Sequence, residues 1–213
     1  MSTMAQSTLN IKTDDEATGK KLPSHVKVAI IGGSRIPFVR SNTSYSHSSN
    51  MDMLSATLQG LVKRFNLAEE RLGEVAAGAV MKHSRDFNLA REATLNSGLS
   101  LQTPAYDVQQ ACGTGLEAAI LVGNKIALGQ IESGIAAGTD TASDAPVAVN
   151  EKYRHMILSL NRAKTLGQRL KALASIRPSF MIPALPANAE PRTGLSMGQH
   201  CELMVKQWNI SRE

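Results

Sequence analysis

The fold of this chain is decided by residues 103–140, which read TPAYDVQQACGTGLEAAILVGNKIALGQIESGIAAGTD. Residues 106–110 are bounded by a proline and by glycines and are predicted to form a β-strand. A glycine-rich turn at residues 113–115 follows, and small or apolar side chains then recur at helical spacing until Gly129 ends the helix. Because almost every position of this helix is small or apolar, we expect it to be buried on most of its circumference. Residues 135–138 begin a second strand.

Cys112 lies between the predicted strand and the predicted helix. Thr114 and Glu117 have the T-x-x-E spacing of a capping box, which places the start of the helix just after the cysteine. Unpaired amide N–H groups and the helix dipole favour negative charge at this point, and therefore the thiolate form of a cysteine. The local pattern fits a nucleophile and a buried, unreactive cysteine equally well.

Length and composition limit the class of protein. A chain of 213 residues with 42% apolar residues can bury one sizeable core. Its two cysteines, without a secretory signal, favour a reducing compartment, and we expect a cytoplasmic protein. No apolar run approaches the ~20 residues that cross a bilayer. Residues 1–25 mix polar and charged side chains without periodicity, which predicts a disordered leader rather than a targeting peptide.

The net charge of +5 is concentrated in one segment. Residues 151–180 hold seven Lys or Arg against one acid, in the amphipathic pattern of one helix or a pair. Such a segment is either a solvated surface or a binding face for an anionic partner: CoA phosphates, a lipid headgroup surface or an acidic protein. Nothing elsewhere resembles a nucleic-acid-binding module, so we expect no nucleic-acid partner. The histidines lack metal-ligand spacing, and we expect no metal site.

Strands and helices alternate before the central stretch. Residues 26–31 form a near-continuous apolar run, VKVAII, which is typical of a strand buried on both faces. Helical spacing predicts a helix at residues 53–65, with Asp52 as its cap, and a short helix at residues 87–97. Residues 72–80 are rich in small residues and are predicted to form another strand.

Alternating strands and helices imply a parallel sheet with right-handed crossovers, and its reactive centre belongs at the carboxyl ends of the strands. Cys112 follows one of those ends. The residues around it, ACGTGLEAA, resemble the nucleophile motif of the thiolases, the Cys-dependent acyl-CoA acyltransferases, whose usual form is N-x-x-C-x-S-G before an alanine-rich helix. Gln109 stands where that family usually has Asn, and Thr114 where it has Ser.

Three further stretches carry the same resemblance. They are SRIPF at residues 34–38, NLAREA at 88–93 and AAGTDTASDAP at 136–146, which resemble the family's A-R-T-P-F, N-x-A-R-x-A and G-G-x-E-x-M-S-x-x-P segments. The resemblance implies an α/β fold with a thiolase-like N-terminal half at residues 26–148, containing a parallel-rich five-stranded sheet with helices on both faces. It also implies a mainly helical, basic and incomplete loop domain at residues 149–213.

The loop domain contains the most discriminating match. Residues 161–170, NRAKTLGQRL, resemble the thiolase subunit of the mitochondrial trifunctional enzyme and its bacterial fatty-acid oxidation relatives. This resemblance implies a hydratase/dehydrogenase subunit as partner, membrane-surface contact through residues 151–180, and a homodimer or tetramer in full-length form. The four prolines of residues 178–191 predict a loop.

The last segment adds candidate substrate contacts. Residues 195–202, LSMGQHCE, resemble the family's M-G-x-x-A-E segment, which implies that Met197 and Gly198 bind substrate, with Met197 lining the pantetheine channel. A core methionine at a helix start is the alternative interpretation. Cys201 and His200 match no catalytic position of the family; we expect Cys201 to be buried in a helix and His200 to lie at the surface.

The resemblance implies thiolytic cleavage of 3-ketoacyl-CoA, as in β-oxidation, or condensation of acetyl-CoA, through an acyl-cysteine at Cys112 with a backbone N–H as oxyanion donor. CoA thioesters would be substrate and cosubstrate, without a tightly bound cofactor. The family's N-E-A-F, G-H-P and C-x-G motifs, which supply its acid and base, are absent from this sequence. We therefore expect a truncated chain that is inactive alone and that exposes the apolar helix after Cys112. A ketoacyl-synthase-type condensing enzyme and a non-catalytic thiolase-like fragment are the alternatives.

Overall fold

The computed structural model describes residues 27–184 and 187–213, so the leader predicted at residues 1–25 lies outside the described residues. The sheet of the described chain has three parallel strands, β1 (Glu74–Ala77), β2 (Ala105–Asp107) and β3 (Gly134–Ala136). β1 is central, with Val75 in register with Ala105 on one side and with Ile135 on the other. The predicted parallel sheet is confirmed, but the described residues contain three strands instead of five, and each is shorter than its apolar run.

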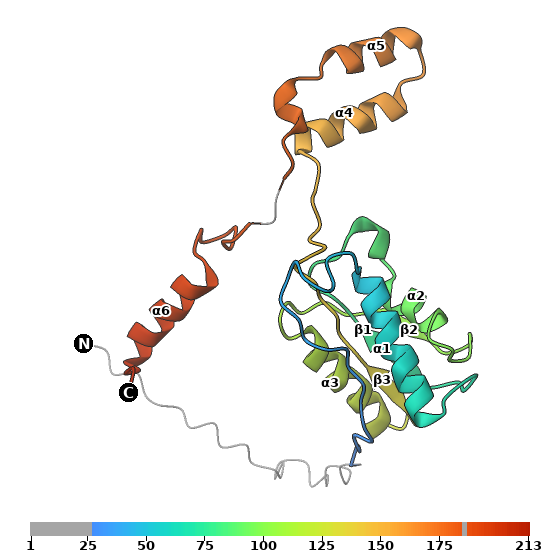
Figure 1. Ribbon diagram of the computed structural model, residues 1–213. Coiled ribbons are helices and arrows are strands. Elements are labelled where there is room, and N and C mark those ends of the chain that lie inside the picture. Colours follow the sequence, from blue (N-terminus) through green and yellow to red (C-terminus); the bar gives the residue numbers. More distant parts are fainter. Residues whose placement is uncertain (1–26, 185–186) are drawn as a thin grey trace, which may run out of the picture.

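Helices cover both faces of this sheet (Figure 1), as predicted. α1 (Asn50–Phe65) and α2 (Leu89–Leu95) pack together, and α2 also contacts β1 and β2. α3 (Thr114–Ala127) contacts β1 and β3. The two layers of helices enclose the central strand.

The core follows the alternation of side chains along β1. Val75 and Ala77 belong to one buried cluster with Leu58 of α1, and Ala76 belongs to a second cluster with Val122 of α3. All four residues of β1 are buried, because a central strand covered on both faces exposes neither. Residues 75–77 are therefore all apolar instead of alternating with polar residues, and the fourth residue, Glu74, is a buried carboxylate.

α1 begins one turn earlier than its apolar residues suggest. Ser49 is the N-cap, and its Oγ accepts a hydrogen bond from the Asp52 amide at 3.1 Å while the Asp52 carboxylate accepts one from the Ser49 amide at 2.9 Å. Asp52, expected as the cap, is thus the third residue of a capping box. The hydrogen bonds from Ser49 hold the pKa of Asp52 below its usual range.

The strand predicted at residues 26–31 is not formed in the part of this run that the structure describes. Residues 27–31 have no regular structure, and Ile30 and Ile31 are 94% and 87% exposed. An apolar run becomes a strand only where a neighbouring strand accepts its hydrogen bonds. No described strand pairs with the free edge of β3, so this requirement is not met.

The burial expected all round α3 is also not observed. Thr114, Ala118 and Val122 are buried, whereas Leu116 and Ile120 on other faces are 68% and 46% exposed. The helix presents one face to the sheet, and the side chains of Leu116 and Ile120 stay exposed in the described structure. This exposure agrees with the expectation stated above for the chain alone.

The rest of the chain lies outside the sheet layers (Figure 1). α4 (Glu151–Arg162) and α5 (Leu166–Ala174) form a hairpin, because Thr165 and Gln168 make a capping box that starts a second helix. The loop predicted at residues 178–191 begins with a 3-10 helix, η2 (Pro178–Met181), since proline is tolerated in a first helical turn. Another 3-10 helix, η1 (Ser84–Asp86), follows β1.

α6 (Met197–Trp208) is the last helix of the described chain and has no buried residue. Cys201 is therefore exposed, not buried as predicted, because no other element covers its helix. His200 is 40% exposed in its side chain, which confirms its surface position. Within the described residues, no helix combines the length and apolarity that a membrane span requires.

Candidate functional site

The turn that carries Cys112 connects β2 to α3. Cys112 is exposed, and α3 begins two residues later at Thr114. The Thr114 hydroxyl donates a hydrogen bond to the Ala111 carbonyl at 2.7 Å and accepts one from the Gln110 amide at 2.9 Å. The capping box predicted for Thr114 and Glu117 is therefore wrong, because the threonine hydroxyl bonds back to the turn and Gly113 is the N-cap without a side-chain bond.

Ala111, just before the cysteine, has a φ of +45°. This left-handed conformation is costly for a residue with a Cβ, and such residues occur mainly where the surroundings hold them for a functional reason. The Thr114 hydroxyl bonds both Gln110 and Ala111 and thereby fixes this conformation. The turn presents Cys112 to solvent at the amino end of a fourteen-residue helix.

Glycines let the other strand ends approach this turn. A Cβ at Gly78, just after β1, would lie 1.9 Å from the Val108 carbonyl oxygen and 2.8 Å from the Thr114 Cγ2. A Cβ at Gly138, after β3, would lie 3.5 Å from the Gly115 Cα. The carboxyl ends of all three strands therefore meet at the Cys112 turn, as expected for the reactive edge of a parallel sheet.

Two carboxylates connect the loops at this edge. Asp140, after β3, accepts hydrogen bonds from the Val80 and Met81 amides at 2.8 and 3.0 Å. Asp107, the last residue of β2, accepts one from the Lys82 ammonium at 2.9 Å. It also accepts hydrogen bonds from the amides of the first two residues of α2, at 3.3 and 2.6 Å. The loop after β1 is thus held from both neighbouring strands.

None of the hydrogen bonds made by the described histidines goes to Cys112. The imidazoles of His83, His155 and His200 each contact a carboxylate instead. The second cysteine, Cys201, lies on α6, which Figure 1 shows apart from the sheet and from α3. Among the described residues, no group of three or more His, Cys, Asp or Glu side chains is arranged to bind a metal ion.

Met197 and Gly198 are the first two residues of α6, and Met197 is 78% exposed. Ser196 and Gln199 form a capping box around them, which explains why a helix starts at this point. The described structure does not bring these two residues beside the Cys112 turn (Figure 1). Their role in substrate binding stays a prediction.

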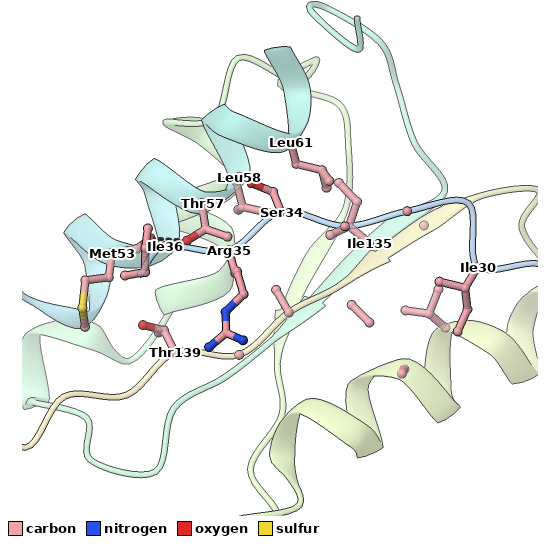
Figure 2. Close-up of a pocket in the computed structure, with 18 of the residues that line it drawn as sticks. Ile30, Ser34, Arg35, Ile36, Met53, Thr57, Leu58, Leu61, Ile135 and Thr139 are labelled. Carbon is pink, nitrogen blue, oxygen red and sulfur yellow. Dashed lines mark hydrogen bonds between the residues drawn. The ribbon is translucent and has the colours of Figure 1, made fainter. Parts of the chain in front are cut away.

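A large cavity among the described residues is separate from Cys112. It has a volume of about 1370 Å³ and lies between residues 27–40, α1, α3 and β3. Figure 2 shows Arg35 extending into it, with Leu58 and Leu61 of α1 on one side and Ile135 of β3 on another. The cavity is the space left where residues 27–31 do not pair with β3, and Cys112 does not line it.

Comparison with known proteins bears on the family and the fold of the chain. Residues 28–213 match the family model described as "Thiolase, N-terminal domain". The chain belongs to the thiolase family. Within it, the chain is 37% identical over 193 residues to a 3-ketoacyl-CoA thiolase of Pseudoalteromonas translucida (strain TAC 125), covering 91% of this chain and 44% of that protein.

Two further relatives support the thiolase assignment. A 3-ketoacyl-CoA thiolase of Photorhabdus laumondii is 38% identical over 187 residues, covering 88% of this chain and 43% of that protein. The crystal structure of the Bacillus anthracis acetyl-CoA acetyltransferase superposes with a TM-score of 0.60 at 20% identity, over 84% of this chain and 40% of that one, and this likeness concerns the fold. The thiolase chain thus spans less than half the length of these relatives.

Sequence reasoning located Cys112 in this thiolase chain but missed the groups around it. The positive φ of Ala111 has no signal in the sequence, because alanine is not a residue that favours it. Asp107 could have been noticed as an acid within the strand predicted at residues 106–110, shortly before a glycine-rich turn. Its partner Lys82 is 25 residues away, and nothing in the sequence pairs the two.

Proposed function

We propose that Cys112 accepts an acyl group from an acyl-CoA, as the nucleophile of thiolytic cleavage of 3-ketoacyl-CoA or of acetyl-CoA condensation. The observation that carries this proposal is the exposed thiol between the carboxyl end of β2 and the amino end of α3. The helix terminus offers N–H groups to a thioester oxyanion. Membership of the thiolase family and the names of the relatives support the same chemistry.

The step is a nucleophilic substitution. The Cys112 thiolate attacks the thioester carbonyl, a new S–C bond forms, and the C–S bond to CoA breaks with CoA leaving as its thiolate, which takes up a proton. Backbone N–H groups at the start of α3 carry the negative charge of the tetrahedral intermediate. CoA thioesters are thus substrate and cosubstrate in this proposal, and no tightly bound cofactor takes part.

We further propose that this 213-residue chain completes few turnovers by itself. A thiol nucleophile needs a base to remove its proton and an acid to protonate the leaving group. Within the described residues, no imidazole is hydrogen-bonded to Cys112, and Cys201 lies on a separate helix. This favours a half-reaction at Cys112 over full catalysis, and keeps a non-catalytic thiolase-like chain as the second candidate. The family assignment favours a thiolase over a ketoacyl synthase.

Labelling the two cysteines tests the proposal within one molecule. Incubation with limiting iodoacetamide at neutral pH, followed by peptide mass spectrometry, should modify Cys112 faster than Cys201, although both are exposed. Acetyl-CoA should add an acetyl group to Cys112, and Cys112→Ser should abolish this adduct while Cys201→Ser leaves it unchanged. Faster labelling of Cys201, or acetylation that survives Cys112→Ser, would contradict the nucleophile assignment.

The basic hairpin of α4 and α5 supports a proposal about partners. No side chain of α5 is buried, and Leu166 and Leu170 are 73% and 58% exposed beside the basic residues. Exposed leucines among cations suit an anionic surface, which is the membrane contact expected for residues 151–180. Co-sedimentation with vesicles containing phosphatidylserine should fall when Arg169 and Lys171 are changed to Glu; equal sedimentation would refute it. The hydratase/dehydrogenase partner, the homodimer or tetramer and the cytoplasmic location stay predictions.

A further inference from the structure

The carboxylate of Asp107 connects three of the elements around the Cys112 turn. Its carboxylate accepts hydrogen bonds from Lys82 of the loop after β1 and from two amides at the start of α2. The side chains of Lys82 and Asp107 are only 17% and 15% exposed. A partly buried ion pair with further hydrogen bonds holds its geometry better than an exposed one.

The loop that carries Lys82 is fixed from its other side as well. Asp140, in the segment after β3, accepts hydrogen bonds from the amides of Val80 and Met81, directly before Lys82. The contacts therefore run from the end of β3, through the loop after β1, to the end of β2. Asp107, where they end, lies five residues before Cys112.

The turn between Asp107 and Cys112 needs support from both ends, because Ala111 is held at a φ of +45°. On the α3 side, the Thr114 hydroxyl supplies it. On the β2 side, the Val108 amide donates to the Ala77 carbonyl at 2.9 Å, and Asp107 with Lys82 ties the strand end to the neighbouring loop.

We propose that Lys82 and Asp107 are positioning residues for Cys112: their ion pair holds the end of β2 so that the turn keeps the sulfur at the amino end of α3. The role in catalysis rests on the function proposed for Cys112. Neither residue touches the reacting thioester in this proposal, and neither acts through its own charge on the sulfur.

This distinction sets the design of the test. A charge acting directly on the sulfur would make Lys82→Met and Asp107→Asn shift Cys112 reactivity in opposite directions, because one removes a cation and the other an anion. Positioning makes both variants act in the same direction. Both should slow iodoacetamide labelling of Cys112 at neutral pH about two- to fivefold, the effect that a helix terminus supplies.

Three references complete the experiment on the full chain. Labelling of Cys201 is the internal standard in each sample. Lys82→Arg should restore the wild-type rate, because it keeps the cation. Lys152→Met is the matched control, since Lys152 is an exposed lysine on α4, and it should change nothing. Circular dichroism confirms that each variant is folded.

Amide hydrogen exchange distinguishes a failure of the positioning role from a failure of the nucleophile assignment of Cys112. Residues 108–116 should exchange faster in both variants than in the wild type and Lys82→Arg. Opposite shifts in the two variants, or exchange and labelling unchanged in both, would overturn the positioning role. A wild-type Cys112 that labels more slowly than Cys201 would instead overturn the nucleophile assignment, and the exchange measurement would still decide whether Lys82 and Asp107 hold the turn.

Discussion

Replacing Lys125 by Met should destabilise the folded chain, because it removes the ion-pair partner of a buried carboxylate on β1. Lys125 is in the last turn of α3, and its ammonium forms an ion pair with Glu74 of β1. The side chain of Glu74 is only 5% exposed, and its other oxygen accepts a hydrogen bond from the Tyr106 hydroxyl at 3.2 Å. Lys125→Met keeps the aliphatic length and leaves this carboxylate with one partner.

The expected loss in unfolding free energy follows from how deeply each of the two paired side chains is buried. Removing one partner of a buried ion pair costs about 3–5 kcal/mol, chiefly because the other charge is left unpaired. Lys125 is 37% exposed, so water reaches the vacated position and we expect roughly 2–3 kcal/mol. Glu74→Gln leaves a lysine that reaches solvent, and should cost about 1 kcal/mol. The double variant should then be more stable than Lys125→Met alone.

Urea denaturation at pH 7, followed by circular dichroism, measures the four free energies of this cycle. Lys152→Met on α4 is the control and should remain within about 0.5 kcal/mol of the wild type. The reasoning is refuted if Lys125→Met costs less than about 1 kcal/mol, or if the double variant loses the sum of the two single losses.

Three further outcomes are expected. Gly78→Ala should lower the free energy of unfolding in urea by more than about 3 kcal/mol, because the new Cβ would lie 1.9 Å from a carbonyl oxygen. The control Gly167→Ala, with open space on α5, should be neutral or stabilising by up to about 1 kcal/mol. Equal losses in the two variants would contradict the argument. Ser49→Ala should cost about 1 kcal/mol and raise the pKa of Asp52 part of the way back in a carboxyl NMR titration, since the backbone N–H of residue 49 remains. The bond to Glu74 raises the pKa of Lys125 above its usual 10.5, so its contribution to stability is complete below pH 10.5 and is lost as pH rises through the folded-state value. Lys125→Met should flatten this alkaline decline in urea titrations, and an unchanged slope would count against the ion pair.

The order of elements follows from local patterns. Helical spacing in residues 53–65 and 116–127, and the small-residue runs before and after them, are properties of neighbouring residues, and α1, α3 and the three strands form where these patterns occur. The resemblance around Cys112 placed the chain in the thiolase family, which the family match confirms. The fold class and the candidate nucleophile were thus accessible from the sequence.

The run at residues 26–31 shows the limit of local patterns. Its apolar residues predict a buried strand, but burial depends on a neighbour that hydrogen-bonds to it, and the described structure supplies none. The same limit explains α3, whose composition predicts burial all round, whereas the sheet covers only one face. A sequence states what a segment can bury, and the packed elements decide what is covered.

The surroundings of Cys112 were decided only by the tertiary structure. Lys82 and Asp107 are 25 residues apart and belong to no recognisable motif. They meet because parallel strands bring their carboxyl ends to one edge of the sheet. The Thr114 hydroxyl does not make the expected capping box, because it accepts a hydrogen bond from the Gln110 amide and donates one to the Ala111 carbonyl. The sequence by itself determined which atom is the candidate nucleophile; packing at the sheet edge determined how that atom is held, because ion pairs and backbone strain exist only once distant residues are in contact.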